Sequence, residues 1–162
     1  MDTEQNSNRR FGGIERLYGT PAWHKLQQAH VTVVGVGGVG SWVVEALARS
    51  GVGHITLIDL DNVAESNVNR QLPAVTPLFG MPKVDALQQR VFDINPACKV
   101  TTIEDFVDED NIATLFAERV DFVVDAIDQV RVNAAMAAWF VRHKQPFVVS
   151  GAAGGQRHPE HV

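Results

Sequence analysis

Cysteine is nearly absent from this sequence, which holds a single one, Cys98. One cysteine cannot form an internal disulfide, and without a C-x-x-C partner it forms neither a structural zinc site nor a redox pair. No apolar run is long enough to span a bilayer, and residues 1–10 lack the apolar stretch of a secretory signal. We therefore expect a cytoplasmic protein that has no membrane partner.

Positive charge is also scarce. The sequence contains 14 lysines and arginines and 19 aspartates and glutamates, so its net charge is −5. This balance excludes a general attraction for nucleic acids, so any RNA contact must come from a local basic patch or from another subunit. The six histidines show no paired spacing on one helix face and predict no metal site. The 162 residues, 45% of them hydrophobic, are enough for one domain with a sizeable core.

What the sequence does have is a glycine-rich turn between a segment typical of a strand and a segment with helical spacing of apolar residues. The β-branched run 31–34 predicts a buried strand, and residues 41–50 carry apolar side chains at helical spacing. Between them stand four glycines that we predict to contact a ligand: Gly35, Gly37, Gly38 and Gly40. Glycine lets the backbone approach an anion closely, and the free N–H groups in the first turn of the following helix bind it. The turn therefore predicts a phosphate site.

Strand-like and helix-like segments alternate along the rest of the chain. We predict strands over 31–35, 54–58, 98–103, 122–124 and 147–149, and helices over 20–29, 41–50, 83–93, 109–117 and 130–142. This order is typical of an α/β fold, a Rossmann-like doubly wound, mainly parallel sheet with helices on both faces. Such a sheet binds ligands beyond the carboxyl ends of its strands. We expect a mobile tail over residues 1–10 and a chain truncated at its C-terminus, because residues 158–162 give no closing helix.

Two uses of the glycine turn compete. Gly35, Gly37 and Gly40 fit the G-x-G-x-x-G spacing, and Asp59 follows about twenty residues later, as in nicotinamide or flavin enzymes. A dinucleotide site needs no dense polar array after that aspartate, yet this chain places four more candidate nucleotide-binding residues there: Asp61, Asn67, Arg70 and Lys83. Cations in such number suit a triphosphate, because they stabilise a leaving pyrophosphate. Asp128, which follows the fourth predicted strand, fits as the carboxylate that holds magnesium.

These motifs resemble the ubiquitin-activating-enzyme-like adenylating superfamily, whose bacterial members include the molybdopterin and thiamine sulfur-carrier activators. The pieces that carry the resemblance are residues 35–41 (GVGGVGS), 59–63 (DLDNV), 66–71 (SNVNRQ), Lys83 and residues 125–128 (DAID). The resemblance implies an ATP-binding adenylation domain over residues 11–162, with the ATP phosphates on the glycine turn and the ribose on Asp59. It further implies phosphate contacts from Asn67, Arg70 and Lys83, and Mg²⁺ on Asp128.

The resemblance also implies a homodimer in which an N-terminal arginine of one subunit reaches the triphosphate bound by the other. Arg16 is the candidate for this arginine and Arg10 the reserve, because Gly13 occupies the position that usually holds it. The residues with an implied catalytic role are then Arg16, Arg70, Lys83 and Asp128.

Within the superfamily the sequence is most similar to the tRNA threonylcarbamoyladenosine dehydratases, through residues 10–13 (RFGG), 16–19 (RLYG), 40–42 (GSW) and 151–156 (GAAGGQ). This similarity implies ATP-dependent dehydration of threonylcarbamoyladenosine in tRNA to its cyclic form, by adenylation of the threonyl carboxylate and ring closure with release of AMP. A sulfur-transfer or cysteine desulfurase protein is an implied further partner. The alternative is adenylation of the C-terminal glycine of a ubiquitin-like sulfur-carrier protein, although Gln129 stands where those enzymes usually carry asparagine.

Four other residues have a simpler interpretation. Trp42 and Trp139 both fall on predicted helices, and we expect them to pack against the core rather than to stack on bases. Asp125 is expected to be a helix or turn partner and not the metal ligand. Cys98 is expected to be a small packed residue.

Overall fold

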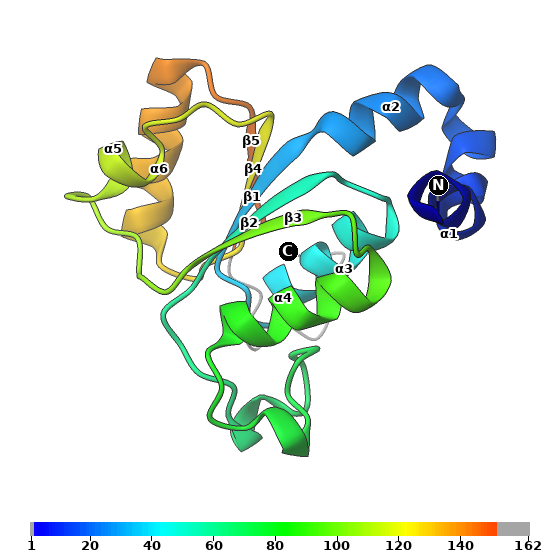
Figure 1. Ribbon diagram of the computed structural model, residues 1–162. Coiled ribbons are helices and arrows are strands. Elements are labelled where there is room, and N and C mark those ends of the chain that lie inside the picture. The colour runs from blue at the N-terminus through cyan, green and yellow to red at the C-terminus, as the bar shows by residue number, and fades with distance from the viewer. Residues whose placement is uncertain (1, 152–162) are drawn as a thin grey trace, which may run out of the picture.

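The computed structural model describes residues 2–151, and its centre is a five-stranded sheet (Figure 1). The strands are β1 (His30–Val34), β2 (His54–Ile58), β3 (Lys99–Ile103), β4 (Phe122–Asp125) and β5 (Phe147–Val149). They lie in the order β3-β2-β1-β4-β5, and every pairing is parallel. The strand order therefore reverses beside β1, which is where a doubly wound sheet binds its ligand. The predicted fold class is confirmed.

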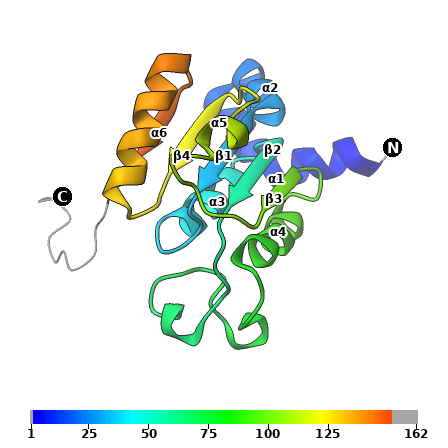
Figure 2. The same cartoon turned by 90° about the vertical axis from the view of Figure 1, so that its left-hand side faces the viewer.

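Helices cover both faces of the sheet (Figures 1 and 2). On one face, α3 (Gly40–Arg49) and α4 (Lys83–Ile94) pack on β1 and β2 through aliphatic side chains, among them Val33, Val44, Leu57 and Leu87. On the other face, α5 (Ile112–Leu115) and α6 (Val130–His143) pack through Val34, Ile58, Met136 and Phe140. Successive side chains of a strand point to opposite faces, so the adjacent residues Val33 and Val34 of β1 pack against helices on opposite faces of the sheet.

The helix predicted over residues 109–117 is shorter in the structure, where α5 spans Ile112–Leu115. A loop held by side chains replaces its first turn. The Asp108 carboxylate accepts hydrogen bonds from the backbone N–H groups of Asp110 and Asn111, both at 2.9 Å, and the Asn111 side chain donates to the Phe106 carbonyl at 2.8 Å. Aspartate and asparagine compete with helical backbone bonds in this way. The prediction was therefore wrong about where this helix begins.

Two helices precede the sheet, α1 (Asp2–Tyr18) and α2 (Thr20–Gln28). The second begins at Thr20-Pro21 as predicted, because proline suits the first turn of a helix. The first is helical from Asp2, and the mobility expected of residues 1–10 stays a prediction. The rings of Phe11 and Trp23 pack with their centroids 5.4 Å apart and close over Gly51, which ties α1 and α2 to the end of α3.

Residues 59–82 leave the sheet between β2 and α4 and form the excursion in the lower part of Figure 1. It contains two short 3₁₀ turns, η1 (Glu65–Asn67) and η2 (Thr76–Leu78), and a small core of its own around Val63. Its two ends are joined by hydrogen bonds, from Val63 N to Met81 O and from Gly80 N to Val63 O, both 2.8 Å. The excursion thus carries its polar residues beyond the carboxyl end of the sheet.

No helix within residues 2–151 is long and apolar enough to cross a membrane. Residues 152–155 of the second glycine cluster lie outside the described residues, as do residues 158–162, on which the expectation of a truncated chain rests.

Candidate functional site

The glycine turn connects β1 to α3 and folds back tightly on itself. Gly35 has a φ of 76°, a conformation that residues with a side chain rarely adopt. A Cβ atom added at Gly40 would lie 1.8 Å from the Gly35 carbonyl oxygen, so only glycine fits there. The N–H groups of Ser41 and Trp42, in the first turn of α3, already donate to the Gly37 and Val39 carbonyls at 3.0 and 3.1 Å. The N–H groups suited to an anion are therefore those of residues 37–40, just before that turn.

Asp59 anchors the glycine turn to the end of β2. One of its carboxylate oxygens accepts a hydrogen bond from Val36 N at 2.8 Å, and the other accepts one from Asp61 N at 2.9 Å. The carboxylate thus fixes the turn and the start of the excursion together. Each oxygen keeps further acceptor capacity, and the contact with a ribose stays a prediction.

The excursion places Arg70 and Gln71 directly over the turn. The Arg70 Cδ atom lies 3.5 Å from the position of a Cβ on Gly38, and Gln71 Nε2 lies 3.5 Å from that of a Cβ on Gly37. The Arg70 side chain is exposed, and its Nη1 donates to Ser66 O at 3.1 Å and to the Asn69 side chain at 2.9 Å. The remaining guanidinium donors of Arg70 stay available beside the turn.

Gln71 is a site residue to which the sequence analysis gave no role. Its side chain is only 8% exposed, and among the described residues its Oε1 atom has no hydrogen-bond partner. A buried carbonyl oxygen without a partner costs about 1–3 kcal/mol. Its place in the sequence, directly after Arg70 in the SNVNRQ motif, was the signal that could have identified it.

Two further predicted residues are buried and already have partners. Asn67 is 9% exposed, and its side-chain oxygen accepts a hydrogen bond from Ala64 N at 3.1 Å, which closes η1. Lys83 begins α4 and is 4% exposed, and its Nζ donates to the Asp61 carboxylate at 2.7 Å. The Asp61 side chain itself is 73% exposed. The ammonium of Lys83 is thus held in place and has two more donors, and its contact with phosphate stays a prediction.

The end of β4 forms the opposite side of the turn, because a Cβ on Gly35 would lie 3.1 Å from the Ala126 carbonyl. Asp125 is fully buried there, and one of its oxygens accepts a hydrogen bond from Ile127 N at 3.2 Å. Burial raises the pKa of this carboxyl to about 6, partly offset by that hydrogen bond. Asn133 donates to the Ile127 carbonyl at 3.2 Å. Of the two roles predicted for Asp125, helix partner and turn partner, the structure shows the second.

Asp128 is exposed and lies in the loop between Ile127 and the start of α6. The backbone of Ile127 is held by two hydrogen bonds, since its N–H donates to Asp125 and its carbonyl accepts from Asn133. Within residues 2–151 no group of three or more histidine, cysteine, aspartate or glutamate side chains is arranged to hold a metal ion. Any metal bound through Asp128 therefore needs oxygen ligands from elsewhere, and the phosphates of a nucleotide supply them in most Mg²⁺ sites of this kind.

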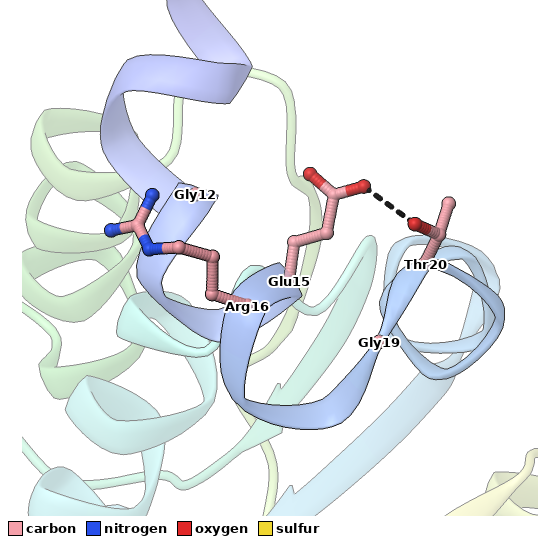
Figure 3. Close-up of a pocket in the computed structure, with 5 residues that line it drawn as sticks. All are labelled: Gly12, Glu15, Arg16, Gly19 and Thr20. Atoms are coloured by element: carbon pink, nitrogen blue, oxygen red, sulfur yellow. Dashed lines mark hydrogen bonds between the residues drawn. The ribbon is translucent and has the colours of Figure 1, made fainter.

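Arg16 lies on α1 and is exposed. It lines an open hollow of about 430 Å³ together with Gly12, Glu15, Gly19 and Thr20 (Figure 3). The Thr20 hydroxyl donates to the Glu15 carboxylate at 2.9 Å across this hollow. The hollow contains none of the glycine-turn residues, so it is separate from the predicted phosphate site.

Arg10 is the reserve candidate for the arginine that reaches the partner's site. Its Nη1 donates to the carbonyls of Asp93 and Ile94, at 3.1 and 2.8 Å, and so caps the C-terminal end of α4. Lys83 begins that helix, whose 12 residues give a length of about 18 Å at 1.5 Å each. The structure therefore brings neither Arg10 nor Arg16 to the glycine turn of its own chain.

The two tryptophans on helices differ. Trp139 is part of the core on the α6 face, in edge contact with Phe140, and confirms the expected packing role. Trp42 does not, because its side chain is 56% exposed, and the expectation that it packs was wrong. Helical spacing placed it on α3 but did not say which face of α3 is covered.

The fold and the site together define a doubly wound α/β domain with a glycine turn for phosphate at its switch point, the class that binds nucleotides. A family model described as the ThiF family matches residues 12–159. The chain belongs to the ThiF family.

Three curated relatives place it more closely. The tRNA threonylcarbamoyladenosine dehydratase of Escherichia coli K12 is 48% identical over 153 residues, which cover 94% of this chain and 57% of the relative. The Bacillus subtilis protein of the same name is 39% identical, over 92% of this chain and 59% of the relative. The E. coli molybdopterin-synthase adenylyltransferase is 38% identical, over 79% and 51%. The chain thus spans between half and three fifths of these relatives.

Solved structures agree with this placement. The crystal structure of the E. coli tRNA N6-threonylcarbamoyladenosine dehydratase in complex with ATP matches with a TM-score of 0.92 at 48% identity, over 94% of this chain and 63% of that chain. The complex of the same protein with AMP matches with a TM-score of 0.91 over the same shares. The fold is therefore shared along nearly the whole chain.

Proposed function

We propose that this chain is the adenylating part of an enzyme that uses ATP to dehydrate threonylcarbamoyladenosine in tRNA to its cyclic form. The observation that carries the proposal is the pairing of a glycine turn with the arginine stem that lies over it, Arg70 on Gly38. The E. coli relative at 48% identity is named for this reaction, and its structures are complexes with ATP and AMP.

In the reaction, an oxygen of the threonyl carboxylate bonds to the α-phosphorus of ATP and pyrophosphate leaves. A nucleophilic atom of the carbamoyl group of the same nucleoside then attacks the carboxyl carbon and its N–H proton is lost, which closes the ring as AMP departs with that oxygen. Adenylation thus turns a poor leaving group into a good one. The contribution of the protein is positioning and the stabilisation of charge that moves onto the leaving groups.

The chain's own residues fit these roles. The glycine turn holds the phosphates through backbone N–H groups, and Asp59, which fixes the turn, accepts from the ribose hydroxyls. Arg70 and Lys83 hold the pyrophosphate, with Lys83 oriented by Asp61. Asn67 shapes the excursion that carries Arg70 and contributes to the phosphate site.

Mg²⁺ also fits the residues present, since Asp128 offers one exposed carboxylate next to the turn. Magnesium binds through one or two carboxylates together with phosphate oxygens and water. When bound, it supplies charge neutralisation at the triphosphate. We expect Asp128 to hold it only when the nucleotide is present, because the described residues form no metal cluster of their own.

We further propose a cytoplasmic homodimer in which Arg16 of one subunit reaches the triphosphate bound by the other. Arg10 already caps α4, whereas Arg16 projects from the exposed side of α1. A guanidinium that cannot reach its own site is available for that of a partner. A sulfur-transfer or cysteine desulfurase protein is proposed as an additional partner.

The second candidate function is adenylation of the C-terminal glycine of a sulfur-carrier protein, which the 38% identity to molybdopterin-synthase adenylyltransferase supports. ATP–pyrophosphate exchange with the full chain separates the two. Exchange that depends on tRNA carrying threonylcarbamoyladenosine supports the dehydratase, and exchange that depends on the carrier protein supports the alternative. The absence of exchange with either, together with NAD binding, would contradict both.

A further inference from the structure

Two of the described glutamines are almost fully buried, and their amides differ. Gln145, just before β5, is 6% exposed, and its amide is bonded at both ends. Its Oε1 accepts from Val120 N at 3.3 Å, and its Nε2 donates to the Val120 and Pro146 carbonyls at 2.9 and 3.1 Å. Gln71 is 8% exposed, yet its Oε1 has no hydrogen-bond partner among the described residues. Buried side-chain amides are nearly always bonded, so the place of Gln71 needs a reason that packing alone does not give.

The backbone around Gln71 holds its side chain against the glycine turn. Gln71 N donates to Asn67 O at 2.9 Å, within the excursion. The next residue, Leu72, donates through its N–H to Ser41 Oγ in the first turn of α3, at 3.2 Å. The Gln71 amide then lies over Gly37, with Nε2 3.5 Å and Cδ 3.8 Å from the position of a Cβ on that glycine. The nitrogen is thus the end of the amide that is nearer to the turn.

The nitrogen is also the end that suits an anion. A primary amide carries two N–H donors on its nitrogen, whereas its oxygen only accepts. Phosphate oxygens accept hydrogen bonds, so they are attracted to the nitrogen and repelled by the oxygen. A phosphate held by the backbone N–H groups of residues 37–40 lies at the same glycines that the Gln71 amide covers.

We propose that Gln71 is a further nucleotide-binding residue, whose Nε2 donates to a phosphate oxygen of ATP over Gly37. This inference rests on the proposed function, in which the triphosphate lies on the glycine turn. The nucleotide then gives the buried amide a partner that the described part of the chain does not supply. Until it binds, the unpartnered amide lowers the stability of the chain, as polar groups kept for a ligand do.

The proposal therefore predicts opposite effects on binding and on stability when the amide is removed. A side chain that only packs against the turn would change the two in the same direction, because a less stable turn binds ATP less well. The two quantities to measure on the full chain are the affinity for ATP, by titration calorimetry, and the urea midpoint of unfolding without nucleotide.

Gln71→Met keeps the length of the side chain and removes its donors and its acceptor. We expect it to weaken ATP binding about tenfold, the loss of one hydrogen bond to a charged group, and to raise the urea midpoint. Gln71→Glu keeps the shape but places a negative charge at the phosphate, so it should weaken ATP binding about 100-fold.

Gln145→Met is the matched control, since it removes the amide of an equally buried glutamine whose partners are all in the chain. It should lower the urea midpoint, because the Val120 backbone loses its partner, and leave ATP affinity unchanged at a temperature where the variant is folded.

Three results would overturn the role of Gln71. Wild-type ATP affinity in Gln71→Met would show that the amide makes no contact with the nucleotide. A fall in both the midpoint and the affinity would assign Gln71 to the structure of the turn. Affinity kept in Gln71→Glu would show that no donor is needed there. A wild-type chain that does not bind ATP would overturn the proposed function itself, whereas ATP binding that is indifferent to residue 71 would overturn only this inference.

Discussion

The two ends of the parallel sheet use their polar side chains differently. At the amino end, the rings of His30 and His54 are stacked with centroids 3.6 Å apart, and each Nε2 bonds a threonine hydroxyl, at 2.8 Å for Thr56 and 3.0 Å for Thr101. Asp121 accepts a hydrogen bond from His30 N at 2.8 Å. The polar groups of this end are thus engaged with one another.

At the carboxyl end, three polar side-chain atoms are buried without a hydrogen-bond partner among the described residues. They are Gln71 Oε1, Asp125 Oδ2 and Asn133 Oδ1. All three belong to segments that border the glycine turn or Ile127. The exposed cation and carboxylate of Arg70 and Asp128 lie at the same end.

The amino end thus pairs its polar side chains with one another, whereas the carboxyl end keeps buried polar atoms without a partner among the described residues. A buried polar atom without a partner costs about 1–3 kcal/mol, so a fold that keeps three of them together at one end carries a cost that a ligand can offset.

The largest contrast concerns activity. Arg70→Ala or Asp128→Ala should lower AMP transfer by about 100- to 1000-fold, the usual loss when a group that stabilises transition-state charge is removed. Both side chains are exposed, so the free energy of unfolding should change by only about 0.5 kcal/mol. Arg49→Ala, an exposed arginine at the far end of α3, is the control and should keep the wild-type rate. Wild-type turnover in either site variant would remove the assignment.

The second contrast uses two glycines. A Cβ added to Gly40 would lie 1.8 Å from the Gly35 carbonyl oxygen. A Cβ added to Gly53 would lie 1.7 Å from the Gln27 carbonyl oxygen. Each glycine-to-alanine change should cost about 3 kcal/mol in urea unfolding, because backbone must move. Only Gly40→Ala should also abolish ATP binding, measured by titration calorimetry at a temperature where both variants are folded. Equal loss of ATP affinity in Gly53→Ala would contradict the separation of the two ends.

The third contrast lies in the pH dependence of stability. Burial raises the pKa of Asp125 from 3.8 to about 6. The stability that its protonated form contributes is therefore full below about pH 4 and is lost as the pH rises to about 6. Asp125→Asn cannot ionise and should be more stable than wild type by about 2 kcal/mol at pH 8. In thermal or urea unfolding this gain should shrink below pH 5, and a gain that is the same at both pH values would argue against a buried titrating carboxyl.

The amino end should respond with the opposite sign and a smaller effect. Burial, then the neighbouring His30 and Lys99, lower the pKa of His54 to about 4, and burial lowers that of His30. A lowered histidine pKa contributes stability above about pH 6.5 that is lost as the pH falls toward 4. His54→Gln should reduce the loss of unfolding free energy between pH 7 and pH 5 by about 1 kcal/mol. An unchanged slope would show that this histidine pair does not titrate with folding.

Most of the fold could be predicted because its signals are local. The β-branched runs, the glycine turn and the strand–helix alternation each lie within a few residues, and they gave all five strands of the sheet. The start of α5 and the helical state of residues 2–10 could not be read in this way. The first depends on side-chain bonds from Asp108, and α1 is anchored by Phe11 on Trp23, a tertiary contact.

The residues of the site can be divided in the same way, into those with a local sequence signal and those that depend on tertiary structure. Glycines with fixed spacing, and Arg70 placed by its motif, could be found from the sequence. The burial of Gln71 and of the Asn133 side-chain oxygen, and the exposure of Trp42, depend on which faces the tertiary structure covers. The distance of Arg10 and Arg16 from the glycine turn likewise follows from the packing of α1 and not from any motif.

The most direct test of the central claim is a crystal structure of the full chain with ATP and Mg²⁺. We predict the triphosphate on the glycine turn, with Arg70 and Lys83 on the phosphates and the metal between Asp128 and a phosphate oxygen. An empty turn under saturating ATP, or an adenine dinucleotide bound there in preference to ATP, would contradict it.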